Sequence, residues 1–384
     1  MATSAAPPPS TSEPRPARLS RLGNFWHRVS EGRRIDDLWS QFAADARSSY
    51  GFYGKDVDWD EVNQLPRWKR PFPIVKQLFW AMMNKLTPAR RVLLLVALVL
   101  LLLSGNGNNT GFDIKAEFLS ALLFLLLLSL ELADKITMKR DLEIAREIQA
   151  WLVPSTPPTI SNAEVAFYTR AQNSVAGDYY DAFYPLDDAS AGGKLMLVMA
   201  DVAGKSVPAA LLMATLQASL RTIASEGLPL SELAIRLNHY ACAHSLGGQR
   251  FTTAVLAEYD PSTRRLAYVN AGHNSPVIRR ANSSTERLES GSLPLGITPE
   301  ATFPSAEVTL HADDTLVLFT DGVVEARDQR DEEFGLKRLE EVVRASSERR
   351  AHEIVRAITT AVDEHSSEVG GPEDDLTVSI VKVK

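Results

Sequence analysis

Acidic residues stand at the ends of several predicted strands in the C-terminal half of the chain. Asp201 and Asp321 each directly follow a run of apolar residues. Asp178 opens a third segment of this kind, and the pair Asp374 and Asp375 leads into a fourth. Strands of one sandwich bring their ends together, so these carboxylates would repel one another unless a bound cation or a shared proton compensates.

The donor types indicate which cation that would be. Carboxylate oxygens without a neighbouring His or Cys pair favour the hard ions Mg²⁺ and Mn²⁺ over zinc. Two such ions about 3.5–4 Å apart hold and deprotonate a bridging water for in-line attack on phosphorus. No Ser, Cys or His nucleophile is then required. The acids therefore predict metal-dependent phosphoryl hydrolysis.

Other interpretations of the stretch around Asp201 are available. An Asp at the end of a strand is often only a turn former, and Asp201 alone would fit either role. The tripeptide Gly-Lys-Ser at 204–206 spells the end of a phosphate-binding loop. That motif needs a further glycine five positions earlier, where Met199 stands, so it is excluded.

Composition limits the class of protein. The chain has 384 residues, 45% of them hydrophobic, and a net charge of −7. This length admits two or three domains with a substantial core. Its one cysteine, Cys242, excludes a disulfide framework and a Cys-rich zinc site, and it is expected to be a packed thiol in an amphipathic helix. The negative charge gives no electrostatic case for nucleic-acid binding.

Residues 159–384 alternate short strands and tight turns with pairs of helices. This order predicts α+β layers built on antiparallel sheets rather than a doubly wound sheet. The predicted strands are 164–171, 178–184, 195–200, 252–258, 265–270, 277–280, 306–310, 315–320 and 376–383, and the predicted helices are 208–226, 230–245, 336–344 and 351–364.

The N-terminal part has a different composition. Residues 1–20 are rich in Pro, Ser and Ala and are expected to be disordered. Residues 21–90 contain several tryptophans and predict short helices of unassigned role. Residues 91–133 hold two apolar runs joined by a polar link, with basic residues outside both runs. This pattern favours a membrane helical hairpin with both ends cytoplasmic; a buried hairpin and a re-entrant insertion are the alternatives.

Residues 134–158 predict a charged linker helix that ends before a proline-rich stretch. Its stripe of Leu142, Ala145, Ile148 and Leu152 either packs on the domain that follows or joins two chains into a homodimer through residues 134–153. We hypothesise that this helix is a regulatory joint for the site that follows.

An ordered set of short sequences runs from about Leu142 to the C-terminus. It reads LEIAREIQAWLVPSTPP, VAGDYYDAF, LVMADVAGKSVPAALLMA, FTTAVLAEYD, LAYVNAGHNSPVI, LPLGI, LVLFTDGVVEARD, FGLKRLEE and EDDLTVSIVKV. Together these resemble the SpoIIE/RsbU-like serine/threonine phosphatases, a bacterial branch of the PP2C (PPM) superfamily. The resemblance implies an αββα sandwich of two antiparallel sheets with a site for two divalent cations, Mn²⁺ or Mg²⁺, between them.

The resemblance also implies roles for individual residues. Asp178 and Asp201 would serve the first ion or bridge both, with the backbone carbonyl of Val202 completing the ligand set, and Asp321 and Asp374 would hold the second ion. Asp374 is preferred over Asp375 because the first acid of that pair is usually the ligand in the family. His273, in the family's AGH sequence, is interpreted as a structural turn residue rather than a catalytic acid.

Two family positions differ here. Ala176 and Ser206 stand where the family commonly has glycine, and neither change removes a ligand. The phosphate-gripping arginine of eukaryotic relatives has no evident counterpart, as is usual in this branch.

The expected function is that of a membrane-associated phosphatase with a cytoplasmic catalytic domain, acting on phosphoserine or phosphothreonine. By analogy, the substrate is an anti-anti-sigma (STAS-type) protein in a partner-switching pathway. A catalytically inactive PP2C-fold regulator and a membrane scaffold acting through residues 1–140 are the alternatives.

Overall fold

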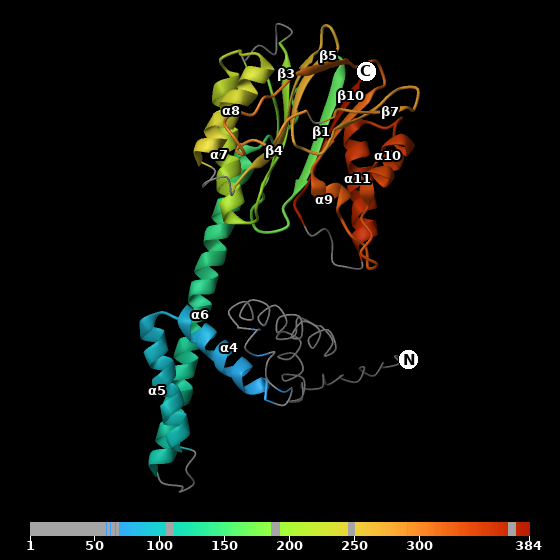
Figure 1. The fold of residues 1–384 in the computed structure, drawn as a ribbon. Coiled ribbons are helices and arrows are strands. Elements are labelled where there is room, and N and C mark those ends of the chain that lie inside the picture. Colours follow the sequence, from blue (N-terminus) through green and yellow to red (C-terminus); the bar gives the residue numbers. More distant parts are fainter. Residues whose placement is uncertain are drawn as a thin grey trace, which may run out of the picture. The chain divides into compact units, whose positions relative to one another are not determined.

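The computed structural model describes residues 69–104, 111–185, 193–244, 250–289, 291–367 and 374–384, together with positions 59, 62 and 66. The chain divides into two compact units, Met1–Asp134 and Lys135–Lys384, and each is described by itself (Figure 1). The predictions for residues 1–20 and for residues 21–58 concern positions outside the described residues.

Two five-stranded sheets with antiparallel pairing form the second unit. The first, which we call the β10 sheet, has the order β1 (Ala163–Arg170), β10 (Leu376–Val383), β9 (Thr315–Phe319), β6 (Val277–Arg279) and β7 (Thr285–Arg287). The second, the β3 sheet, has the order β2 (Asp178–Phe183), β3 (Leu195–Val202), β4 (Thr252–Asp260), β5 (Arg265–Ala271) and β8 (Ala306–Thr309).

Helices cover the outer face of each sheet (Figure 1). The β3 sheet carries α7 (Val207–Ala224) and α8 (Leu230–His244), whereas the β10 sheet carries α10 (Gly335–Ala345) and α11 (Ala351–Ser366) beside the one-turn α9 (Asp321–Val324). One apolar cluster lies under each helical layer, and another lies between the sheets. The predicted αββα sandwich is confirmed.

The sequence of β3 follows from this layering. Met196 and Val198 pack toward the helices, and Leu195 and Leu197 pack toward the other sheet. Because both faces of the strand are buried, it reads as a continuous apolar run rather than an alternating one. The strand is therefore a rigid central support for the acid near its end.

The predicted element boundaries differ from the structure by a few residues, and two differences affect the acids. The strand predicted over 195–200 continues to Val202, because Asp201 still pairs with Thr253 of β4. Asp201 is thus a member of the strand rather than the residue after it. Asp321 opens α9, a helix that the sequence analysis did not predict.

The first unit contains α4 (Pro71–Lys85), α5 (Pro88–Ser104) and the beginning of α6 (Gly111–Leu152). Ser120 Oγ donates to the carbonyl of Ala97 at 2.8 Å, and Arg90 Nη1 contacts Glu131 at 2.8 Å, so α5 and the first part of α6 pack as a hairpin. The second apolar run and the linker helix were predicted as separate elements; both belong to the single helix α6.

The hairpin exposes large apolar side chains. Leu102 is 78% exposed, Phe118 73% and Leu128 65%. Among the described helices, two are long and apolar enough to cross a membrane, Lys115–Leu152 within α6 and Val207–Ala224, which is α7. Because α7 buries its apolar face in the core of the second unit, α6 is the remaining candidate.

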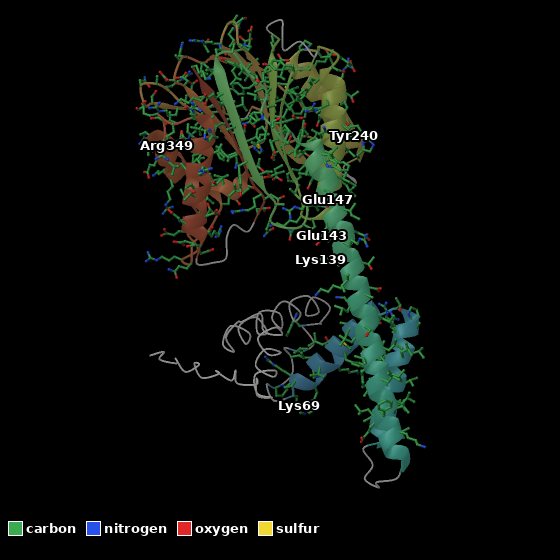
Figure 2. All side chains as sticks on the ribbon, turned by 180° about the vertical axis from the view of Figure 1, so that it is seen from behind. Lys69, Lys139, Glu143, Glu147, Tyr240 and Arg349 are labelled. Atoms are coloured by element: carbon green, nitrogen blue, oxygen red, sulfur yellow. The ribbon has the colours of Figure 1, made fainter. Side chains whose placement is uncertain are left out.

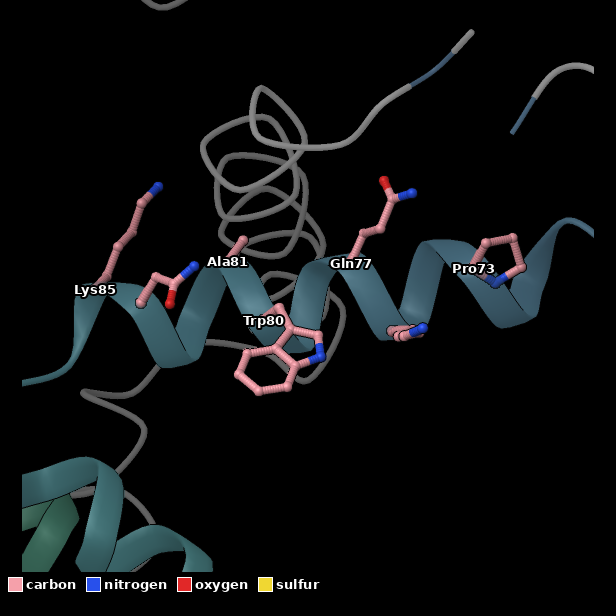
Figure 3. Close-up of a pocket in the computed structure, with 7 residues that line it drawn as sticks. Pro73, Gln77, Trp80, Ala81 and Lys85 are labelled. Atoms are coloured by element: carbon pink, nitrogen blue, oxygen red, sulfur yellow. The ribbon is translucent and has the colours of Figure 1, made fainter. Parts of the chain in front are cut away.

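A hollow of about 490 Å³ runs along α4 (Figure 3). Its lining consists of Pro73, Lys76, Gln77, Trp80, Ala81, Asn84 and Lys85, all from this one helix. The lining contains no carboxylate, imidazole or thiol, so this hollow lacks the ligands for a metal centre.

Candidate metal centre

The four predicted acids come in pairs, one pair from each sheet. Asp178 and Asp201 are direct partners in the ladder between β2 and β3. Asp321 lies two residues after β9, Asp374 lies two residues before β10, and β9 and β10 are neighbours. The adjoining ends of two strands in each sheet thus position the acids.

Electrostatic repulsion links the two pairs. Burial, followed by repulsion from Asp321 and Asp374, raises the pKa of Asp201 to about 7. Burial and then Asp201 raise the pKa of Asp178 well above its usual range. Burial and then Asp374 raise the pKa of Asp321. The acids from the two sheets therefore share one region of raised negative potential.

Two glycines allow the backbone to come close to these acids. A side chain at Gly322 would collide with the carbonyl oxygen of Asp375. At Gly177, a Cβ would lie 3.3 Å from the carbonyl oxygen of Val202 and 3.7 Å from Asp201 Oδ1. The Val202 carbonyl, expected as a ligand, therefore lies in the same region as the carboxylate of Asp201.

The adjacent acids Asp374 and Asp375 have different partners. Both oxygens of Asp375 accept backbone hydrogen bonds, Oδ1 from Gln172 at 2.8 Å and Oδ2 from Gly177 at 2.6 Å. Asp374 Oδ2 instead pairs with Lys205 Nζ at 3.1 Å. Asp375 holds the loop that precedes β2, whereas Asp374 contacts the exposed ammonium group of Lys205.

The chemistry of these donors fits hard divalent cations. All are oxygens, and the raised pKa values of Asp178, Asp201 and Asp321 mean that added positive charge would relieve their repulsion. As the side chains lie, no group of three or more acidic, histidine or cysteine side chains within the described ranges is arranged to hold an ion.

Two threonines that the sequence analysis did not single out contact the site. Thr320 and Thr377 both donate to Asp178 Oδ2, at 2.8 Å and 2.6 Å. Each lies beside a predicted ligand, in the sequences Thr-Asp-Gly and Asp-Asp-Leu-Thr. That adjacency was the available signal, but a hydroxyl inside a buried strand does not reveal its partner.

Gln149, near the end of α6, holds the backbone just before Asp178. Its Nε2 donates to the carbonyl of Ala176 at 2.7 Å, and its Oε1 accepts from Ala176 N at 2.9 Å. A cavity of about 340 Å³ between α6 and β1 reaches from Gln149 to Asp178. The end of α6 thus contacts the same loop that Asp375 fastens.

The packed face of α6 differs from the predicted stripe in one position. Leu142, Ala145 and Leu152 are partly buried as expected, but Ile148 is 49% exposed and Gln149 takes its place. Figure 2 shows Lys139 and neighbouring acidic residues projecting from another side of this helix. The packed face of α6 differs from the prediction because Gln149, which bonds the backbone of Ala176, packs against the domain in place of Ile148.

His273 is a buried residue that lies two positions after the end of β5. Its Nδ1 lies 2.8 Å from Thr253 Oγ1, and its backbone N–H donates to Asn270 Oδ1 at 2.9 Å. Burial lowers the pKa of His273 to about 4, so the imidazole is neutral near pH 7. A neutral, enclosed imidazole agrees with the structural role expected for it.

The fold has relatives of known structure. It is similar to the SiaA-PP2C domain of Pseudomonas aeruginosa with a TM-score of 0.58 and 19% sequence identity, over 66% of this chain and 99% of that domain. Two antiparallel sheets flanked by helices, with acids at the adjoining strand ends, therefore define a PP2C-like sandwich.

Sequence comparison identifies the branch. The profile of the Stage II sporulation protein E (SpoIIE) family matches residues 191–384, and the chain belongs to this family. It is 29% identical over 198 residues to the phosphoserine phosphatase RsbP of Bacillus subtilis, covering 50% of this chain and 47% of RsbP. It is 28% identical over 191 residues to the phosphoserine phosphatase RsbU of the same organism, covering 50% of this chain and 55% of RsbU. The chain spans about half the length of these relatives.

Proposed function

We propose that the protein is a divalent-metal-dependent phosphatase that hydrolyses phosphoserine or phosphothreonine in a protein substrate. The observation that carries the proposal is that acids from the two sheets meet: Asp201 lies opposite Asp178 in the β3 sheet, and Asp321 and Asp374 from the ends of β9 and β10 repel it. The names of the relatives RsbP and RsbU as phosphoserine phosphatases support the same reaction.

The residues of the chain have separate tasks in this proposal. Asp178, Asp201 and the Val202 carbonyl would hold one ion, and Asp321 and Asp374 the other. When bound, Mn²⁺ or Mg²⁺ supplies the charge that polarises the phosphoryl group and activates the attacking water.

The surrounding groups prepare this arrangement. Asp375 keeps the loop before Asp178 in place through its two backbone contacts. Lys205, whose ammonium lies at Asp374, stands beside the acids, where it can pair with the negative charge of a phosphoryl group.

The substrate and location follow from family analogy and from the first unit. We propose a phosphorylated STAS-type regulator of a partner-switching pathway as the substrate, which is an inference from relatives rather than from the site. The exposed apolar side chains of the hairpin support insertion into the cytoplasmic membrane through residues 91–133, with the catalytic domain on the cytoplasmic side.

The linker helix is the proposed regulatory element. Its Gln149 holds Ala176, two residues before Asp178, so movement of the end of α6 would displace the loop that carries a ligand. The exposed side chains Ile144, Ile148 and Trp151 lie at helical spacing on another face and support a homodimer through residues 134–153.

The test is hydrolysis by the purified full-length chain. Mn²⁺-dependent release of phosphate from p-nitrophenyl phosphate and from candidate phospho-STAS proteins is expected, with loss of turnover in Asp201→Asn. Phosphoprotein binding with no turnover by the unsubstituted chain would contradict the proposal in favour of an inactive regulator. Cellular output that survives Asp201→Asn would favour a scaffold instead.

A further inference from the structure

Two buried hydroxyl groups converge on a single oxygen of Asp178. Thr320 Oγ1 and Thr377 Oγ1 lie 2.8 Å and 2.6 Å from Asp178 Oδ2. Thr320 and Thr377 are 0% exposed, and Asp178 is 4% exposed. Water has little access to replace either hydroxyl, so the hydrogen bonds of this carboxylate oxygen depend on the two threonines.

The contact crosses from one sheet to the other. Thr377 belongs to β10 and Thr320 directly follows β9, both in the β10 sheet, whereas Asp178 begins β2 in the β3 sheet. Along the chain, Thr320 is 142 residues and Thr377 is 199 residues after Asp178. The Asp178 carboxylate is therefore held by residues of the β10 sheet, whose strands β9 and β10 also position Asp321 and Asp374.

Counting protons fixes the direction of each hydrogen bond. A threonine hydroxyl has one proton to donate, and Asp178 in the ionised form that binds a cation has none. Because the Thr377 proton goes to Asp178, the 2.9 Å contact between Thr169 Oγ1 and Thr377 Oγ1 requires Thr169 to be the donor. Thr377 N donates in turn to Thr320 Oγ1 at 3.0 Å, so each of the two hydroxyls that bond Asp178 also accepts a hydrogen bond.

Both hydroxyl bonds fall on the same oxygen. Asp178 Oδ2 accepts from Thr320 and Thr377, which leaves Oδ1 as the oxygen that can bind an ion. A carboxylate with one oxygen anchored is already oriented, so it loses less rotational freedom when a ligand binds than an unanchored one.

We infer that Thr320 and Thr377 are positioning residues that anchor Asp178 Oδ2 and direct Asp178 Oδ1 toward a divalent cation. The inference rests on the proposed function and assigns a task to residues that are not themselves ligands. Valine matches threonine in shape but cannot donate, so each single substitution removes one of the two hydrogen bonds that anchor this buried oxygen.

The experiment measures Mn²⁺ binding to the full-length chain in detergent by calorimetry, with p-nitrophenyl phosphate turnover followed in parallel. Thr320→Val and Thr377→Val are each expected to weaken Mn²⁺ binding by about 10- to 100-fold. Thr320→Ser and Thr377→Ser retain the donor and are expected to restore most of the affinity.

Thr315→Val is the matched control. Thr315 is a fully buried threonine in β9 whose Oγ1 has no hydrogen-bond partner, so its hydroxyl should have no influence on the ion. If a valine variant at 320 or 377 does not fold, the Ser and Ala variants at the same position provide the comparison, because both lack the methyl group and only Ser keeps the hydroxyl.

The outcomes separate the inference from the proposed function. Folded valine variants that bind Mn²⁺ as tightly as the unsubstituted chain overturn the inference and leave the phosphatase proposal intact. Equal Mn²⁺ affinities of the Ser and Ala variants at one position would also overturn the inference and leave the phosphatase proposal intact. An unsubstituted chain that neither binds Mn²⁺ nor hydrolyses phosphate overturns the proposed function itself.

Discussion

Asp178 and Asp201 lie directly opposite each other in the ladder between β2 and β3. Like charges at directly opposed positions destabilise a pair of strands, and burial increases the repulsion. The sandwich places this pair at the adjoining ends of two buried strands. The free energy of folding therefore depends on what compensates these carboxylates, namely protons or cations.

The first prediction concerns pH in the presence of a chelator. The pKa of Asp201 is about 7 in the folded protein, against about 3.9 in an unfolded chain. Between these values the folded state holds a proton that the unfolded state has released. The contribution of Asp201 to the free energy of unfolding should therefore fall as pH rises from about 4 to about 7 and change little above that.

Urea unfolding with EDTA at about pH 5 and about pH 8 measures this difference. In Asp201→Asn the dependence should be reduced, because the substituted side chain does not titrate. Added Mn²⁺ should stabilise the unsubstituted protein mainly at the higher pH. A flat profile for the unsubstituted protein would argue against a repelling acid cluster.

The second prediction separates Asp374 from Asp375. Asp375→Asn removes at least one of the two hydrogen bonds to the loop before β2, because an amide nitrogen cannot accept. Its free energy of unfolding should fall by about 1–3 kcal/mol without added metal. Asp374→Asn should leave that stability nearly unchanged or raise it, and should weaken Mn²⁺ binding instead. If urea titration shows the loss of stability in Asp374→Asn and calorimetry shows the loss of Mn²⁺ binding in Asp375→Asn, then Asp375 is the ligand and Asp374 holds the loop.

The third prediction tests the contact between α6 and the loop. Gln149→Glu keeps the size of the side chain but cannot donate to the carbonyl of Ala176, so turnover or its Mn²⁺ requirement should change by roughly tenfold. Glu147→Gln is the matched control on the same helix, where Figure 2 labels an exposed side chain. Equal kinetics for the two variants would remove Gln149 from the regulatory proposal.

The fourth prediction distinguishes packing from self-association along α6. Leu142 is partly buried, whereas Ile148 is 49% exposed. Leu142→Asp should disturb activity in a monomer, but Ile148→Asp should do so only if this face joins a second copy. Activity of Ile148→Asp, measured alongside sedimentation of the full-length chain, decides between the two. A dimer that is unaffected by Ile148→Asp would place the contact elsewhere.

The fifth prediction concerns Ser206, which precedes α7. Its backbone has φ +65° and ψ −147°, a conformation that glycine adopts readily and serine does not, and its side chain makes no capping hydrogen bond. Ser206→Gly should therefore raise the free energy of unfolding by about 1 kcal/mol. Thermal or urea unfolding measures the change, and a loss of stability would mean that the serine has a contact worth more than the strain.

The sequence predicted those features that depend on local patterns. The buried strand ending near Asp201 and the helix that follows it both appear in the structure, because apolar runs and helical periodicity are local signals. The end of the strand was misplaced, since the pairing of Asp201 with Thr253 depends on the register of β4. The resemblance to a known family was needed to select the sandwich.

Polar partners formed over long distances were not predictable. The adjacency of Thr320 to Asp321 does not indicate that its hydroxyl bonds Asp178, because the contact exists only when both sheets are assembled. The placement of Gln149 rather than Ile148 against the domain has the same origin. Helical spacing identifies neighbouring positions on a face, but it does not say which polar side chain will find a backbone partner.

The order of the β10 sheet has a consequence for how the protein is made. β10 lies between β1 and β9, and its Thr377 pairs with Thr169, 208 residues earlier in the chain. During synthesis on the ribosome, the edge of β1 that pairs with β10 therefore stays unpaired until β10 has emerged. A product that stopped before Asp374 would leave β1 and β9 with open edges, which are surfaces for aggregation. Premature termination should yield insoluble chains rather than weakly active ones.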